Sequence, residues 1–165
     1  MASDICQEMM DVVNRRDEVT GRLPREEIYK QSLMHRIVHV IVFDNTGKIA
    51  LQKRSSVVSF CPSHWSTSAG GHVQSGESYR EAAERELKEE LGISLPLRLM
   101  KKHFYRAPNT PNKFLSVYKA VFDGPFDFDH GVVSEISFFT TKQIGEMIEG
   151  GKKIHPELLF IFRGL

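Results

Sequence analysis

Cysteine, tryptophan and long apolar runs are all scarce in this sequence. Its 165 residues include 2 cysteines, Cys6 and Cys61, and 1 tryptophan, Trp65. Two cysteines are too few for a disulfide framework and fit a reducing cytosol. No apolar run approaches roughly 20 residues, the length that a membrane-spanning helix requires, and the N-terminal stretch lacks the apolar segment of a signal peptide. We therefore expect a soluble, cytoplasmic protein with no membrane partner.

An excess of either charge is also missing. Lysine and arginine number 22 against 21 aspartates and glutamates, and the formal net charge is +1. A nearly neutral chain has no general attraction for nucleic acid, so we expect no nucleic-acid partner. The length favours a single domain over residues 1–165, large enough for a hydrophobic core. Whether the chain forms a homodimer stays open.

The hydrophobic pattern alternates between strand-like segments and turns, with few helices. Strands are expected at 34–43, 48–54, 97–105, 114–122 and 134–140, and two short strands precede a helix from Pro24 within residues 11–33. After the turn Asn45-Thr46-Gly47, the strand at 48–54 is expected to return as the hairpin partner of the strand at 34–43, and residues 55–67 are expected to form a loop. Further helices are expected after the turn at residue 71, from a cap at Thr141 and from Pro156. Such an order predicts an α/β fold whose mixed sheet is covered on both faces.

The stretch over residues 71–93 gathers carboxylates on one helix. Ser78 is expected to cap its start and Gly92 its end. At about 100° per residue, three carboxylates fall on one arc of the helix, those of Glu86, Glu89 and Glu90. Carboxylates crowded in this way repel one another, and a hard divalent cation such as Mg²⁺ would relieve the repulsion. Without further features, a solvated acidic helix would be the simpler interpretation.

The spacing of the fixed residues makes the pattern specific. It reads G-x5-E-x7-R-E-U-x-E-E-x-G-U, where U is a bulky aliphatic residue, and it resembles the signature of the Nudix hydrolase family. The matching residues are Gly71, Glu77, Arg85, Glu86, Leu87, Glu89, Glu90, Gly92 and Ile93. The resemblance implies the Nudix fold, an α/β/α sandwich with a mixed β-sheet, in which the signature helix packs against the sheet.

The resemblance also implies a reaction, the attack of water on a phosphorus atom of a small-molecule diphosphate. A nucleoside diphosphate or a related compound would be the substrate, and Mg²⁺ or Mn²⁺ the cofactor. Carried over by position, the metal ligands are Glu86, Glu89, Glu90 and a main-chain carbonyl of Gly70 or Gly71. Glu86 and Glu89 are also expected among the catalytic residues. Arg85 is expected to act with Glu77 by aiming the glutamates.

Substrate contacts are expected from the strand at 48–54. Lys53 and Arg54 point to opposite faces, so only one of them faces the site. Arg54 is the better candidate, because a guanidinium can bind two phosphate oxygens. Three aromatic residues near the ends of later strands are expected in the core rather than stacked on a substrate: Phe104, Tyr105 and Phe114.

A further carboxylate from outside the signature is a common addition in this family. The candidates are Glu135, at the start of a strand, and Asp127 and Asp129, in the preceding loop. Glu135 is the first choice as a catalytic residue, because a strand controls its position better than a loop does. The competing interpretation is a solvated glutamate at a strand edge.

Residues 35–93 resemble the isopentenyl diphosphate isomerase branch of the superfamily, and residues 11–33 resemble the leader of isomerase-like hydrolases. This raises allylic isomerisation as a rival activity, and a non-catalytic ligand sensor as a third. His35 and His72 match metal-binding histidines of the isomerases. However, Gly70 occupies the place of the isomerase's acid-base cysteine, and the strand at 114–122 carries no carboxylate. Hydrolysis is therefore favoured.

Overall fold

The computed structural model describes residues 8–165. Its strands are β1 (Met9–Val13), β2 (Val19–Pro24), β3 (His35–Phe43), β4 (Ile49–Arg54), β5 (Trp65–Ser66), β6 (Ala69–His72), β7 (Arg98–Tyr105), β8 (Lys113–Val121) and β9 (Val133–Phe139). Its helices are α1 (Arg25–Lys30), α2 (Tyr79–Leu91), α3 (Thr141–Glu149) and α4 (Pro156–Phe162). Within the described residues, no helix is both long and apolar enough to cross a bilayer.

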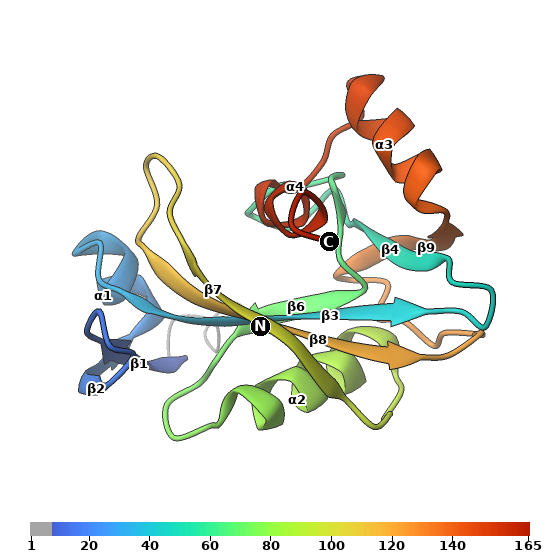
Figure 1. The fold of residues 1–165 in the computed structure, drawn as a ribbon. Helices are drawn as coiled ribbons and strands as arrows, with labels where there is room; N and C mark the ends of the chain where they lie inside the picture. Colours follow the sequence, from blue (N-terminus) through green and yellow to red (C-terminus); the bar gives the residue numbers. More distant parts are fainter. Residues whose placement is uncertain (1–7) are drawn as a thin grey trace.

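The sheet lies between helices on both of its faces. Figure 1 shows α2 below the sheet, and α3 and α4 above it. At the centre, β3 pairs in parallel with β8 over its whole length and antiparallel with β6 from Ile37 to Val40. The expected α/β class and the mixed sheet are confirmed.

The expected hairpin between β3 and β4 opens after one residue pair. Phe43 pairs with Ile49, and beyond that point β4 pairs with β9 and β5 instead. Instead of β4, β6 pairs with this edge of β3, and the pairing brings Gly70 and Gly71 to the centre of the sheet. This exchange of partners is non-local, so the sequence signal for a hairpin did not reveal it.

Beyond one-residue shifts at strand ends, the structure differs from expectation at a helix cap, at a helix end and in an additional strand. The cap of α3 is Thr140 rather than Thr141: its side chain accepts a hydrogen bond from the N–H of Gln143. The helix after Pro24 ends at Lys30, earlier than the expected stretch, and β5 falls inside an expected loop. A short strand of this kind carries little periodicity, and helix ends are the part of an element that sequence patterns define least well.

Two clusters of buried side chains cover the two faces of the sheet. Below it, Ala83, Leu87 and Leu91 of α2 pack against β3. Above it, Ile144 of α3 and Leu158 of α4 pack on the other face. Full burial of one leucine side chain stabilises the fold by roughly 1.5–3 kcal/mol. This packing holds the acidic face of α2 against β6.

Candidate active site

The ends of α2 are set by the residues that the sequence suggested. Ser78 Oγ accepts from the N–H of Glu81 at 3.2 Å, and Glu81 Oε2 accepts from the N–H of Ser78 at 2.8 Å. Gly92 has a φ of 68°, a left-handed conformation that favours glycine at a helix C-terminus. With these caps and the apolar stripe in place, Glu86 and Glu90 lie beside β6.

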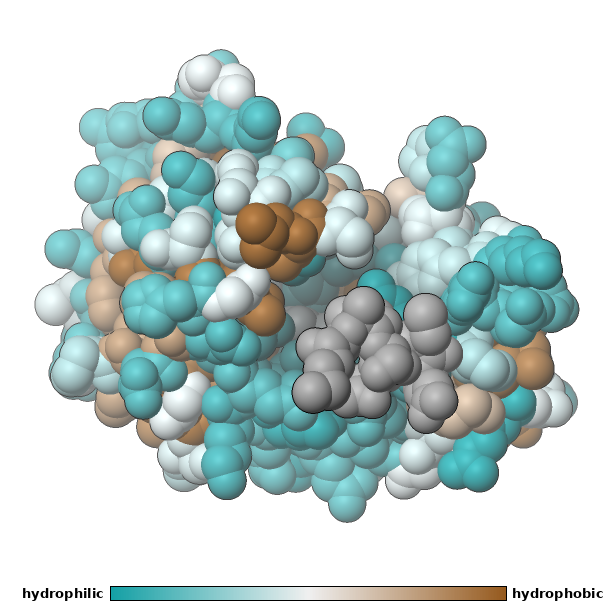
Figure 2. Space-filling model, turned by 180° about the vertical axis from the view of Figure 1, so that it is seen from behind, coloured by the Kyte–Doolittle hydropathy of each residue, from teal (hydrophilic) through white to brown (hydrophobic). Residues whose placement is uncertain are grey.

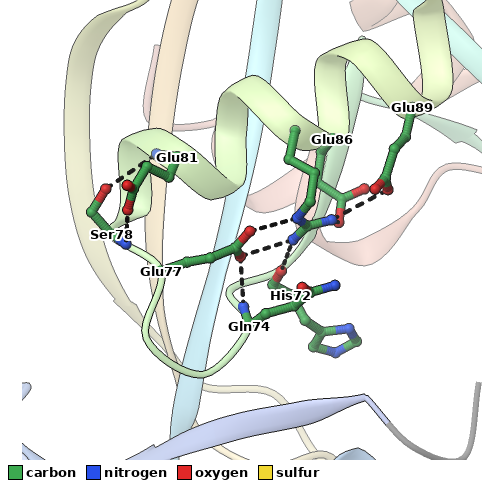
Figure 3. A network of polar contacts seen from close by, with 8 residues as sticks. His72, Gln74, Glu77, Ser78, Glu81, Glu86 and Glu89 are labelled. Atoms are coloured by element: carbon green, nitrogen blue, oxygen red, sulfur yellow. Dashed lines mark hydrogen bonds and ion pairs between the residues drawn. The ribbon is translucent and has the colours of Figure 1, made fainter.

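Arg85 joins the signature loop to the acidic face of the helix (Figure 3). Its Nε donates to Glu77 Oε1 at 2.6 Å, and its Nη2 donates to Glu77 Oε2 and to the carbonyl of His72, both at 3.0 Å. Its Nη1 donates to Glu86 Oε1 at 2.7 Å and to Glu89 Oε2 at 3.2 Å. A guanidinium that holds several carboxylates at once fixes their orientation. Arg85 is thus positioned to aim Glu86 and Glu89.

Glu86 and Glu90 form a buried pair of like charge. The side chain of Glu90 is buried, and burial raises its pKa. Burial, together with the charge of Glu90, raises the pKa of Glu86 to about 8, although Arg85 opposes this shift. Two neighbouring carboxylates in a site of low dielectric cannot both ionise easily without a compensating cation. Arg85 alone therefore does not balance the charge of the two carboxylates.

The glycines of β6 are required by close contacts. A Cβ on Gly71 would overlap the carboxylate of Glu86, and a Cβ on Gly70 would lie 2.8 Å from His39 Nδ1 and 2.9 Å from the carbonyl oxygen of Val38. The N–H of Gly70 also faces Glu90 Oε1 at 3.4 Å. The backbone of β6 thus approaches both glutamates, and position 70 has no room for a cysteine side chain.

Gln52 on β4 is a site residue that the sequence reasoning missed. Its Nε2 donates to Glu90 Oε2 and to the carbonyl of Ser68. Because both partners are acceptors, the amide must face them with its nitrogen. Its Oε1 is buried and has no hydrogen-bond partner among the described residues. Side chains alternate between the two faces of a strand, so Gln52 lies on the same face of β4 as Arg54. This alternation could have identified Gln52 from the sequence.

These groups fit a divalent cation. Oxygen ligands are available from Glu86, Glu90 and the unpartnered Oε1 of Gln52, and hard cations such as Mg²⁺ prefer oxygen. Within residues 8–165, no three His, Cys, Asp or Glu side chains already converge as a metal site. Glu89 is the most exposed of the three glutamates, since its side chain is 58% exposed, and it is the least constrained to serve as a metal ligand. The amide or a backbone carbonyl would therefore complete the ligand set.

A cavity of about 650 Å³ opens beside this pair. Glu86, Gly70 and Gly71 line it from α2 and β6, and Lys113 and Glu157 line it from β8 and α4. These two groups of lining residues define its two ends. Figure 2 shows the surface hollowed beside the protruding loop between β7 and β8.

The two candidate substrate residues on β4 face different surroundings. Arg54 lines the cavity, and its Nε donates to the carbonyl of Phe60 at 2.9 Å. Lys53 lies over the ring of Trp65 instead, with its Nζ 6.0 Å from the ring centroid. Of the two, Arg54 is placed to contact a ligand.

The three candidate catalytic carboxylates outside the signature, Glu135, Asp127 and Asp129, do not line the cavity in the described part of the chain. Glu135 is exposed on β9 opposite Lys53, and its Oε1 accepts from Ser137 Oγ at 3.4 Å. Asp129 donates its backbone N–H to the carbonyl of Glu90 at 3.0 Å, while its carboxylate accepts from the N–H of Gly131. Asp127 is exposed.

His35 and His72 each make one ring hydrogen bond, His72 lines the cavity, and His35 Nε2 is buried without a partner among the described residues. His35 Nδ1 donates to the carbonyl of Leu33 at 3.0 Å, and His72 Nε2 lies 2.7 Å from the hydroxyl of Tyr29. Burial lowers the pKa of both histidines, that of His35 to about 4. The neighbouring strand β8 presents leucine and valine to the core rather than carboxylates.

The aromatic residues of β7 and β8 pack among themselves. Tyr105 belongs to the core cluster above the sheet, and the rings of Phe104 and Phe114 lie 5.1 Å apart. None of the three lines the cavity in the described residues.

Taken together, the acidic pair, the arginine that aims it and the glycine strand form a candidate hydrolase site on an α/β/α sandwich. A family model for the NUDIX domain matches residues 33–160. The chain belongs to the Nudix hydrolase family.

Relatives by sequence include both hydrolase and isomerase names. The chain is 34% identical to the "Uncharacterized Nudix hydrolase YfcD" of Escherichia coli over 137 residues, which cover 83% of this chain and 76% of the relative. It is 33% identical to the "Isopentenyl-diphosphate Delta-isomerase 2" of Photorhabdus laumondii, over 73% of this chain and 68% of the relative. The expected isomerase-like branch is confirmed.

Solved structures share the fold. The DR0079 protein of Deinococcus radiodurans aligns with a TM-score of 0.82 and 28% identity, over 94% of this chain and 98% of that one. A MutT protein of Methanosarcina mazei aligns with a TM-score of 0.65 and 19% identity, over 78% of this chain and 89% of that one.

Proposed function

We propose that the protein hydrolyses a diphosphate bond in a small molecule, such as a nucleoside diphosphate or a related compound, with Mg²⁺ or Mn²⁺ as cofactor. The observation that carries this proposal is the buried Glu86–Glu90 pair, whose raised pKa values mark a site in need of positive charge. A diphosphate bound there needs the same neutralisation. We further infer that residues 1–165 act as one domain in the cytoplasm.

Each residue has a part in this proposal. Glu86, Glu89 and Glu90 would hold the cation, with an oxygen of Gly70 or Gln52 as a further ligand. The cation, when bound, neutralises charge on the phosphate oxygens and lowers the pKa of a water molecule. Glu86 orients the attacking water, and Arg85 keeps Glu86 and Glu89 in place through its contacts at 2.7 and 3.2 Å.

Hydrolysis is preferred over isomerisation because of Gly70. A side chain at this position would collide with His39 Nδ1 and the carbonyl of Val38, so an acid-base cysteine does not fit. The test is proton exchange at the allylic carbon of isopentenyl diphosphate, followed by NMR in deuterated buffer. Steady incorporation of deuterium with Mg²⁺ present would favour the isomerase.

The first prediction is that Glu90→Gln lowers turnover by at least about a hundredfold, the low end for a catalytic group. Turnover is measured as phosphate released from a panel of diphosphates with Mg²⁺ or Mn²⁺. The matched control is Glu84→Gln, an exposed glutamate on the same helix, which should keep its activity. A Glu90→Gln protein as active as the wild type on its best substrate would refute the proposal. Metal-dependent ligand binding without turnover by the wild type would favour a sensor.

A further inference from the structure

At the other end of the cavity from Glu86, the lining contains buried ionisable side chains. Lys113 of β8, Glu157 of α4 and the preceding His155 all line it, and all are buried. Burying charges costs free energy unless they are paired, and such groups concentrate at functional sites. The signature does not include any of these residues.

Glu157 is fully engaged within this cluster. Its Oε2 accepts from His39 Nε2 at 2.8 Å, and its Oε1 accepts from Lys113 Nζ at 3.1 Å. Burial alone would raise the pKa of Glu157, but the hydrogen bond from His39 and the charge of Lys113 lower it. Glu157 is therefore an anion with one donor at each oxygen, and it fixes the ammonium group of Lys113.

His155 presents a hydrogen-bond donor to the cavity. Its Nδ1 accepts from the N–H of Glu157 at 3.2 Å, so the proton of the neutral ring is on Nε2. Burial lowers the pKa of His155 to about 4, and the charges of Arg54 and Lys113 add to this effect, so the ring is neutral at pH 7. No protein acceptor for Nε2 occurs among residues 8–165.

The hydrogen-bonding groups and charges at this end of the cavity favour a ligand that accepts hydrogen bonds and carries negative charge. The charges of Lys113 and Arg54 act on the pKa of His155, as does His39, and they oppose the charge of Glu157. Arg54 uses Nε for the carbonyl of Phe60, and its terminal nitrogens have no partner in the described residues. The groups of His155 and Arg54 that remain uncommitted are thus donors.

We propose that Lys113 and His155, with Arg54 at the rim, form an oxyanion subsite for a phosphate or carboxylate group that does not touch the cation site. The subsite rests on the proposed diphosphate hydrolysis and adds a second anchor for the same substrate. Its anion is either the terminal phosphate of the diphosphate or an acidic group on the attached moiety. Glu157 is a positioning residue, because it acts through Lys113.

Inorganic phosphate is the probe, titrated in EDTA so that binding is independent of the metal and of turnover. Backbone amide and histidine ring signals are followed by ¹⁵N–¹H NMR. We expect saturable shifts at Glu157 and His155. His155→Asn keeps an acceptor to cap α4 but loses the Nε2 donor, and should weaken phosphate binding at least about tenfold.

A second variant protects the test against misfolding. Lys113→Met with Glu157→Gln removes both charges together, which avoids an unpaired buried ion, and it should weaken phosphate binding to a similar degree. Lys48→Met, an exposed lysine in the turn between β3 and β4, is the matched control and should bind phosphate as the wild type does. Glu90→Gln should also keep phosphate binding in EDTA, even if it loses hydrolysis.

Competition between phosphate and methylene diphosphonate identifies which part of the substrate supplies the anion. With Mn²⁺ and methylene diphosphonate bound, exclusion of phosphate from His155 assigns the subsite to the terminal phosphate. Phosphate that still binds assigns it to an acidic group elsewhere in the substrate. The subsite is overturned if the wild type shows no saturable phosphate shifts at His155, or if both cavity variants bind phosphate like Lys48→Met. Hydrolysis could still stand in that case.

Discussion

The two ends of the cavity treat a buried carboxylate in opposite ways. At the signature helix, Glu86 lies beside Glu90, and its pKa rises to about 8. At the start of α4, Glu157 lies between His39 and Lys113, and its pKa falls. Both carboxylates lose hydration on burial, so the partners decide the sign of the shift. One end needs a cation from outside, whereas the other is compensated by the protein itself.

The same substitution at the two ends should therefore have opposite effects on stability. Glu157→Gln leaves Lys113 buried without its counter-ion and should cost roughly 3–5 kcal/mol of unfolding free energy. Glu86→Gln, studied in EDTA above pH 8, relieves the repulsion from Glu90 and should instead stabilise the fold by roughly 1 kcal/mol. Urea unfolding of both variants measures the difference. A similar loss of unfolding free energy in both variants would contradict the predicted difference between the two ends of the cavity.

Stability in EDTA should depend on pH through the Glu86 end. The folded pKa of Glu86, about 8, lies above its ordinary value of 4.5, so the folded state holds the proton more tightly than the unfolded state does. Stability that is complete below pH 4.5 is then lost as the pH rises towards 8. Adding Mg²⁺ should reverse this loss. Melting temperatures between pH 5 and 8.5, with and without Mg²⁺, test both statements, and Glu86→Gln should flatten the profile.

Gln52 offers a smaller test of the same end. Gln52→Leu keeps the volume of the side chain but removes the donor to Glu90 and the unpartnered oxygen. The affinity for Mn²⁺, followed by electron paramagnetic resonance, should fall about tenfold, as for partners that orient metal ligands. Gln143→Leu, on α3, is a control of the same type that lies outside the cavity lining. Unchanged Mn²⁺ affinity in Gln52→Leu would remove Gln52 from the site.

Glu135 should give the smallest effect. Its side chain is exposed and lies outside the cavity lining of the described residues. We expect Glu135→Gln to change turnover less than about twofold and to keep the acidic limb of the pH–rate profile, as a bystander would. A large loss of turnover with a vanished acidic limb would instead make Glu135 the catalytic base.

Much of the fold could be predicted because it depends on local patterns. The strand pattern of β3 and β8 and the caps of α2 lie in contiguous residues. The exchange of β4 for β6 beside β3 was missed, because a turn such as Asn45-Thr46-Gly47 signals a hairpin but not its length. Pairing between distant segments leaves no periodic trace.

Within the site, the signature helix and the places of Arg85, Glu86, Glu89 and Glu90 on it could be predicted from the sequence. Helical geometry converts their spacing directly into one acidic face. The distant groups that meet that face and the cavity beside it depend instead on tertiary packing: Gln52 from β4, Lys113 from β8 and Glu157 from α4. The pKa of a carboxylate depends on such neighbours and on burial. Spacing along the chain therefore predicted where the carboxylates of α2 lie, and packing decided which buried carboxylate is compensated by the protein.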